Sequence, residues 1–150
     1  MTEQTTCDVS HDPATCTCKQ CRKAELAAAL PYFTGSTELH KSFLGLYYTD
    51  GIRYLAEKAG AYWLIDLIAS HQPRVRQTLL RIEERDFQLW ILKRLLKTCK
   101  ADWKIEAWTD TPGSDCSVKL TQQVIPYSDF PLDEFQCYVV DGTMMLKTEY

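Results

Sequence analysis

The sequence has no apolar run long enough to cross a membrane. Its most apolar stretch, residues 61–69 (AYWLIDLIA), is interrupted by Asp66 and falls far short of the ~20 apolar residues that a transmembrane helix needs. Residues 1–22 carry Glu3, Asp8 and Asp12 and no apolar run, which excludes a secretory signal peptide. We therefore expect a cytoplasmic protein without a membrane partner.

The motifs of the common enzyme classes are missing as well. The sequence contains no glycine-rich phosphate loop, no HExxH, no GxSxG and no EF-hand calcium loop, and it has no internal repeat or low-complexity tract. Its net charge of -3 is too small to make the whole molecule a polycation or a polyanion mimic. These absences favour a binding module over an enzyme, and they leave any electrostatic partner to local patches.

What is present is the composition of an ordinary folded domain. The 150 residues are 45% hydrophobic and 25% charged, close to the averages of soluble globular chains, and the length suits a single core. Composition changes near Arg22, because the residues before it have no large aliphatic side chain except Val9. We predict a Cys/His-rich tail over residues 1–22, disordered or held by a metal, and a single α+β domain over residues 23–150.

Cysteine is concentrated in this tail. The chain has seven cysteines, an odd number that favours thiols or metal ligands over a disulfide framework when no export signal is present. Thiolate and imidazole are ligands that Zn²⁺ prefers, and the CxxC spacing lets two sulfurs reach one tetrahedral ion. A disordered tail and a redox CxxC are the alternatives. The candidate zinc ligands are Cys7, His11, Cys16, Cys18 and Cys21.

Two helical segments are predicted at the start of the domain. Residues 23–33 are rich in helix formers. We expect the helix to stop at Pro31, because proline disfavours the helical conformation at the residue before it. Residues 34–37 then form a turn, in which Ser36 or Thr37 is available as a helix cap. A further helix begins after the TDG sequence at residues 49–51, where apolar residues recur at helical spacing.

Glycine and proline set the expected ends of the next segments. Gly60 predicts a break or kink, and Pro73 excludes continuation of the helix past residues 71–72. Residues 74–100 fit either a helix or a buried strand, and we predict a short helix followed by a strand over residues 87–95.

From residue 103 onward the hydrophobic period is two, which predicts antiparallel strands with one wet face. Trp103, Ile105 and Ala107 alternate with charged residues, and a similar pattern covers residues 118–121. The pair Asp141-Gly142 between two apolar runs predicts a type I′ hairpin. The expected fold is α+β, with N-terminal helices packed on a C-terminal antiparallel sheet.

Five segments carry the most distinctive patterns: FTGSTELHKS (33–42), YYTDGIRYLAEKAGAYWLIDLIASHQ (47–72), QLWILKRL (88–95), QQVIPYSDFPLDEF (122–135) and MMLKTEY (144–150). Together they resemble an uncharacterised bacterial family, a domain of unknown function found in bacterial and mobile-element genomes. The resemblance covers roughly residues 30–150, and TDG, AYWLID and SDFPL are its most specific parts. It implies a single cytoplasmic α+β domain with no assigned activity and no catalytic residues, and it leaves out the cysteine-rich tail.

The remaining reactive side chains have structural explanations. Unpaired cysteines in or beside strands usually behave as small buried hydrophobes, so we assign Cys99, Cys116 and Cys137 to the core. A Cys-His nucleophilic pair would need His40 or His71, whose spatial neighbours the sequence does not fix.

Two carboxylates stand out. Asp50 in TDG fits a cap or turn role. Asp66 in an apolar helix must face solvent or find a partner such as Arg53 or Lys58, in a polar network that orders the fold.

Charge is distributed unevenly along the chain. Residues 74–100 hold eight Lys or Arg against three acids, whereas the last fifty residues hold nine acids against three bases. The basic segment predicts a nucleic-acid surface, with Trp90, Trp103 and Trp108 as stacking planes, or else a solvated charged face with core tryptophans. The candidate nucleic-acid-binding residues are Arg74, Arg76, Lys93 and Arg94.

We therefore expect a small binding module, and its first candidate partner is a protein. The interface would be the aromatic-rich surface around Tyr47, Tyr48, Tyr62 and Trp63. Nucleic acid is the alternative partner, through the basic segment. A small enzyme is the third hypothesis, and it requires a cleft that joins Asp50, Asp66 and either His40 or His71.

Overall fold

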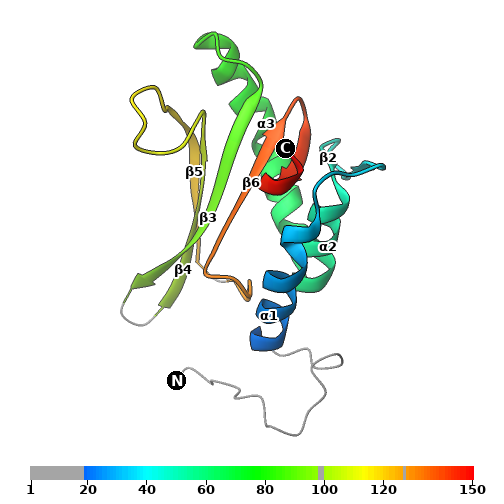
Figure 1. Cartoon of the computed structure of the whole chain (residues 1–150). Coiled ribbons are helices and arrows are strands. Elements are labelled where there is room, and N and C mark those ends of the chain that lie inside the picture. Colours follow the sequence, from blue (N-terminus) through cyan, green and yellow to red (C-terminus); the bar gives the residue numbers. More distant parts are fainter. Residues whose placement is uncertain (1–18, 98–99, 127) are drawn as a thin grey trace, which may run out of the picture.

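The structure, a computed structural model, describes residues 19–97, 100–126 and 128–150. In this part of the chain, three α-helices lie on one side of a seven-stranded β-sheet (Figure 1). Helix α2 contacts strand β7, helix α3 contacts strand β5, and α1 packs on α2. This confirms the α+β class and the packing of helices on a sheet. The predicted tail over residues 1–22 lies almost entirely outside the described residues.

Helices α1 and α2 end close to where the sequence predicts. Helix α1 spans Lys19–Ala29 and passes into a 3-10 turn, η1, over Leu30–Tyr32, which contains Pro31. Helix α2 spans Asp50–Ala59 and ends at Gly60, whose φ of 61° is in the left-handed region that favours glycine. Helix α3 then begins at a new angle, so the predicted break at Gly60 is confirmed.

The prediction that Pro73 ends the helix is wrong. Helix α3 spans Tyr62–Arg81 and carries Pro73 inside it. Proline cannot donate the helical hydrogen bond to the carbonyl of Ala69, which usually costs ~3 kcal/mol. The apolar face continues past the proline, however, because Val75 and Leu79 are as deeply buried as the residues before it. Burial against the sheet therefore outweighs the lost hydrogen bond, and what was predicted as a short separate helix after residue 73 is the second half of α3.

The strands form one sheet in the order β1-β2-β7-β6-β3-β4-β5. All neighbouring pairs are antiparallel except β2 and β7, which are parallel. The C-terminal antiparallel sheet is therefore confirmed, and the N-terminal half adds two short strands that the sequence did not indicate. The strands are β1 (His40–Lys41), β2 (Tyr47–Tyr48), β3 (Phe87–Lys97), β4 (Lys100–Trp108), β5 (Lys119–Ile125), β6 (Glu134–Val140) and β7 (Thr143–Leu146).

The β6–β7 turn is a predicted feature that the structure confirms. Asp141 and Gly142 have φ angles of 48° and 79°, the two positive values that a type I′ turn requires. The carbonyl of Gly142 also accepts a hydrogen bond from the backbone N–H of Tyr47 at 3.0 Å, which starts the parallel pairing of β2 with β7. The same turn thus closes one hairpin and docks the next strand.

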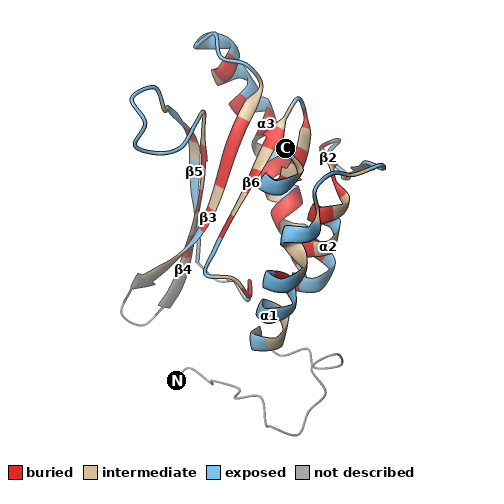
Figure 2. Ribbon diagram, in the orientation of Figure 1, coloured by how far each residue is buried: buried red, intermediate tan, exposed pale blue. Residues whose placement is uncertain are grey.

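The core lies between the helices and one face of the sheet. Figure 2 shows buried residues on the strands and on the helix surfaces that face them. Trp90 and Trp103 are each 1% exposed, and the ring of Phe130 packs edge-on to Trp103 with centroids 5.8 Å apart. Two buried amides sit in this core, where Gln72 of α3 and Gln88 of β3 exchange hydrogen bonds of 2.9 Å in both directions.

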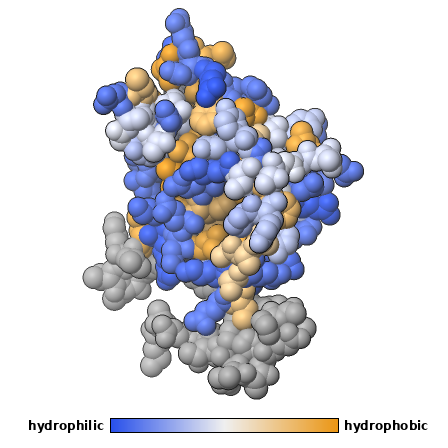
Figure 3. All heavy atoms as spheres, viewed as in Figure 1, coloured by the Kyte–Doolittle hydropathy of each residue, from blue (hydrophilic) through white to orange (hydrophobic). Residues whose placement is uncertain are grey.

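On the face seen in Figure 3, hydrophilic residues dominate, and the hydrophobic ones form small separate areas. Within the described ranges, none of the helices combines the length and the apolar character that a membrane span requires.

Candidate functional site

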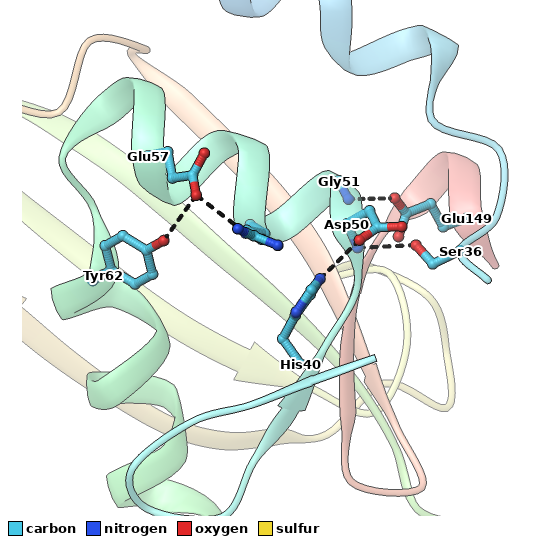
Figure 4. A network of polar contacts seen from close by, with 8 residues as sticks. Ser36, His40, Asp50, Gly51, Glu57, Tyr62 and Glu149 are labelled. Atoms are coloured by element: carbon cyan, nitrogen blue, oxygen red, sulfur yellow. Dashed lines mark hydrogen bonds and ion pairs between the residues drawn. The ribbon is translucent and has the colours of Figure 1, made fainter. Parts of the chain in front are cut away.

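The TDG sequence forms the N-terminus of α2, where a network of polar contacts converges (Figure 4). Thr49 is the N-cap residue, but its side chain makes no capping hydrogen bond. Instead, the hydroxyl of Ser36 accepts a hydrogen bond from the backbone N–H of Asp50 at 2.9 Å. The Asp50 carboxylate accepts one from Nε2 of His40 at 2.8 Å. No helix begins directly after residues 34–37, where the sequence offered Ser36 or Thr37 as a cap. The Ser36 hydroxyl instead bonds the first turn of α2, fourteen residues later.

Gly51 brings the C-terminus of the chain to this network. Its backbone N–H donates a 2.9 Å hydrogen bond to Oε1 of Glu149, in the 3-10 turn η2 (Lys147–Glu149). A Cβ atom on Gly51 would overlap both this carboxylate and the side chain of Leu146. Only glycine allows so close an approach. The carboxylate also lies at the positive end of the helix dipole, which favours a negative charge there.

The network has a structural role, because it ties the first turn of α2 to Ser36 and to Glu149. We call these contacts the latch. Two of the free N–H groups of the first helical turn are already taken by Ser36 and Glu149, so the usual anion site of a helix N-terminus is filled from within the chain. His40 and Asp50 form a pair that could move a proton, with the ring of Tyr48 5.4 Å from that of His40.

A second part of the network in Figure 4 involves Glu57. Its Oε1 accepts hydrogen bonds from Nε of Arg53 at 3.1 Å and from the hydroxyl of Tyr62 at 3.4 Å. The hydrogen bond from Arg53 to Glu57 raises the pKa of that guanidinium, while burial followed by the charge of Glu57 raises the pKa of Tyr62. Lys58 pairs with Glu25 of α1.

These pairings correct the expectation for Asp66. Arg53 and Lys58 are bound to glutamates, and Asp66 is exposed on α3. Of the two outcomes that the sequence allowed, the carboxylate faces solvent.

The cleft that an enzyme would need does not join the predicted residues. His40 lies on β1, one edge of the sheet, and is bound to Asp50. His71 lies on α3, where its Nε2 donates to Oε1 of Gln123 at 2.8 Å, and Gln123 belongs to β5 at the other edge of the sheet. The structure thus brings Asp50 and His40 together and leaves Asp66 and His71 elsewhere.

The three cysteines that the sequence assigned to the core have different outcomes. Cys137 is buried in β6 as predicted, and burial raises the pKa of its thiol well above the ordinary range. Cys116 is exposed, so its assignment to the core is wrong: it lies in the turn after β4 rather than in a strand. Cys99 lies outside the described residues.

The candidate zinc site lies mostly beyond the described residues. Cys7, His11, Cys16 and Cys18 all fall there, and Cys21 is half-buried in α1. The described residues contain no group of three or more side chains that could hold a metal ion. Zinc binding by the tail stays a prediction.

The predicted nucleic-acid residues lie on different surfaces. Arg74 and Arg76 belong to α3, and Arg76 lies 3.8 Å from Asp86. Arg94 faces the helix side of β3, where its Nη1 lies 3.6 Å from Asp133, whereas Lys93 points to the opposite side of the sheet and is exposed.

The three predicted stacking tryptophans also separate. Trp90 and Trp103 are buried in the core, so they offer no stacking plane. Trp108 is half-buried on the face of the sheet turned away from the helices. Core tryptophans were one of the two alternatives, and that reading holds for two of the three.

The predicted aromatic surface is split by the sheet. Tyr47 and Tyr62 are partly exposed, but Tyr48 packs against His40, and Trp63 packs edge-on to Phe130 with centroids 6.4 Å apart. Tyr47 and Tyr48 are consecutive in β2 and therefore point to opposite faces.

An exposed apolar surface that the sequence analysis did not identify lies beside β1 and β2. The turn between these strands places Phe43 and Leu44 in its centre, with the N–H of Gly45 bonded to the carbonyl of Ser42 at 3.0 Å. Phe43 is 97% exposed and Leu44 is 54% exposed. Large apolar side chains in the middle of a tight turn depart from the usual polar composition of turns, and this signal could have identified the surface from sequence.

A cleft of about 350 Å³ adjoins this turn. A second hollow of about 190 Å³ lies at the end of α3, where Leu80 is exposed, and Arg76 lines both hollows. We call the first hollow, beside the turn, the hairpin cleft. Its lining residues are Leu44, Gly45, Leu46, Ala69, Gln72, Pro73 and Arg76.

The comparisons with known proteins give one positive result. The model of a family of unknown function, DUF6876, matches residues 24–150. The chain belongs to this family. The match agrees with the resemblance found in the sequence and leaves out all five candidate zinc ligands, which precede residue 24. The searches of curated proteins and of solved structures found no match to the chain.

Proposed function

We propose that this DUF6876 protein is a binding module that captures a segment of a partner protein at the hairpin cleft. The observation that carries the proposal is Phe43, which stands almost fully exposed at the tip of the β1–β2 turn, next to Leu44 on the rim of the cleft. An aromatic anchor beside a hollow is the arrangement from which a few interface residues supply most of the binding energy.

The shape of the site favours an extended segment as the occupant. Strand β1 is an edge strand, because in the described sheet it pairs with β2 on one side only. An extended segment that adds to such an edge gains main-chain hydrogen bonds and places alternate side chains in adjacent pockets. The hollow at Pro73 offers such a pocket, since its walls include Leu44, Leu46 and Ala69.

The proposal is tested by crosslinking from the anchor position. A photoreactive phenylalanine analogue replaces Phe43 in the full chain, and a second variant carries it at Tyr32, which is 85% exposed on η1. We expect one dominant crosslinked protein from the Phe43 position and none of it from Tyr32. Isolated partner should then lose binding about tenfold or more to the Phe43→Ala variant.

Two outcomes would contradict the proposal. One is the same set of crosslinks from both positions, which would mark them as random encounters. The other is a partner whose affinity is unaffected by Phe43→Ala and by Leu44→Asp, since both variants alter the exposed tip and leave the buried core intact.

A further inference from the structure

In the part of the chain that the structure describes, helices α1, α2 and α3 lie on one side of the sheet and leave its other face uncovered. Residues of β3 alternate between its two faces, so that Trp90 and Leu92 point into the core while Leu89, Ile91 and Lys93 point away from it. We call this second side the open face. Figure 1 shows α1, α2 and α3 all on the other side of the sheet.

An apolar and aromatic row crosses the open face. The strand registers place Trp108 opposite Leu89, Leu89 opposite Tyr138, and Tyr138 opposite Met145, on four neighbouring strands. Leu89 is buried although no helix covers it, because the large side chains beside it shield it. Neighbouring strands are ~4.8 Å apart, so the two aromatic rings stand roughly 10 Å from each other along the row.

A cluster of three rings extends this row. Phe87, Tyr138 and Tyr150 lie with their centroids 5.0, 5.5 and 5.3 Å apart, and Tyr150 is 64% exposed. The C-terminal turn η2 carries Tyr150 onto this face, while its neighbour Glu149 holds α2. The row therefore has exposed aromatic surface at a fixed place.

A basic row lies four residues farther along the strands. Lys93 of β3 stands directly opposite Lys104 of β4, a cross-strand pair of like charges that is unfavourable on its own. Lys104 is held by Glu106 at 2.9 Å, and Glu106 also holds Lys119 of β5 at 3.2 Å. Glu134 of β6 stands opposite Lys93 on its other side. Glu134 and Glu106 offset part of the repulsion, and a bound phosphate would offset the remainder.

Cations also lie over the rings of the open face. Lys119 stands 5.1 Å from the ring of Trp108, and Lys147 stands 5.8 Å from that of Tyr138. Arg85 lies 4.9 Å from the ring of Phe87.

The open face carries more positive than negative side chains. Among the residues that the structure describes, six cations accompany three acids there. The cations are Lys41, Arg85, Lys93, Lys104, Lys119 and Lys147, and the acids are Asp102, Glu106 and Glu134.

We propose that the open face binds single-stranded nucleic acid. Bases would stack on Trp108, Tyr138 and Tyr150, and phosphates would lie against Lys93, Lys104 and Lys119. A sheet face that combines aromatic platforms with positive charge suits a flexible strand, because every base has a flat face and every nucleotide has a phosphate. A duplex hides its base faces and gains nothing from the rings.

The test uses the full chain and fluorescein-labelled oligonucleotides, dT20 and rU20, with binding followed by anisotropy between 50 and 200 mM KCl. Three phosphate contacts predict a slope of roughly -2 in the plot of log K against log salt, a loss of about tenfold or more over this range. Lys93→Ala should reduce the magnitude of that slope by about 0.7. Trp108→Leu and Tyr150→Leu should each weaken binding about tenfold at constant salt.

Matched controls come from other surfaces. Arg81→Ala removes a cation from the exposed end of α3, and Tyr32→Leu removes an exposed ring from η1. Both should bind as the parent does. Tyr150 is 64% exposed, so its variant carries the stacking test if Trp108→Leu unfolds.

Three results of the binding measurements would overturn the proposal. These are salt-independent or absent binding by the parent, equal losses in the open-face and control variants, and tighter binding of a 20-base-pair duplex than of the single strands. Masking of Trp108 and Tyr150 by the partner protein crosslinked from Phe43 would also overturn it, because the face would then belong to a protein interface. The hairpin cleft is on another surface, so failure here leaves the protein-binding proposal standing.

Discussion

The two faces of the same sheet use the same residue types in opposite ways. On the covered face, Trp90 and Trp103 lose almost all contact with water, and the indole N–H of Trp90 is bonded to Gln88 at 2.8 Å. On the open face, Trp108 is half-buried, and its indole N–H is bonded to Glu106 at 3.0 Å. Lys119 lies over its ring. One face stabilises the fold through burial, and the other leaves aromatic rings and charged side chains partly exposed.

Removing a tryptophan from each face of β4 should give the largest contrast. Trp103→Ala leaves a cavity in the core and should lower the free energy of unfolding by about 3–5 kcal/mol. Trp108→Ala removes a half-exposed ring and should cost about 1–2 kcal/mol. Urea denaturation monitored by circular dichroism measures both. Equal costs would mean that the open face is part of the core.

Gly51 offers the next contrast, between a crowded glycine and an open one. The added methyl group of Gly51→Ala collides with Glu149 and Leu146 and should destabilise the protein by about 2–3 kcal/mol. Gly35→Ala meets no atom within 4 Å and should change stability by less than about 0.5 kcal/mol. Thermal unfolding of the two variants checks the latch, and similar melting temperatures would refute it.

The buried amide pair tests polar bonding on the covered face. Gln88→Leu leaves both the side chain of Gln72 and the indole N–H of Trp90 without their partner and should cost about 1–3 kcal/mol. The double variant Gln72→Leu/Gln88→Leu should recover part of this loss, because one unsatisfied amide is removed. A double-mutant cycle in urea measures the coupling, and additive losses would contradict it.

The smallest effect is expected on the open face, at Glu106. Burial raises the pKa of this carboxyl group, but hydrogen bonds from Lys104 and Lys119 more than offset the rise, so its pKa lies below the usual value. Its contribution is therefore present above pH ~4.5 and is lost as the pH falls through the folded-state pKa. Glu106→Gln should remove less than about 1 kcal/mol at pH 7, and this difference should shrink as the pH falls through the folded-state pKa. A loss that stays constant as the pH falls would indicate packing rather than charge.

Much of the fold could be predicted because local patterns were strong. Alternating burial in β4, the left-handed Gly60 and the Asp141-Gly142 turn each follow from the chemistry of a few neighbouring residues. The prediction at Pro73 was wrong, because the burial of Val75 and Leu79 against the sheet outweighed the local tendency of proline to end a helix.

The surfaces could be predicted only in part. Residues 74–100 looked like one basic patch, but α3 and the two faces of β3 distribute its charges over separate sides of the molecule. The contact between Gly51 and Glu149 joins residues ninety-eight positions apart, and no local pattern records such a contact. The rows of the open face depend on strand order and register, which periodicity alone does not give.

The most direct test of the contrast between the two faces is hydroxyl-radical footprinting of the full chain, read by mass spectrometry, with and without dT20. We expect Trp108 and Tyr150 to be oxidised in the free protein and protected by the oligonucleotide, while Trp90 and Trp103 stay unmodified in both samples. Unchanged oxidation of Trp108 and Tyr150 at saturating oligonucleotide, or oxidation of Trp103 in the native protein, would contradict it.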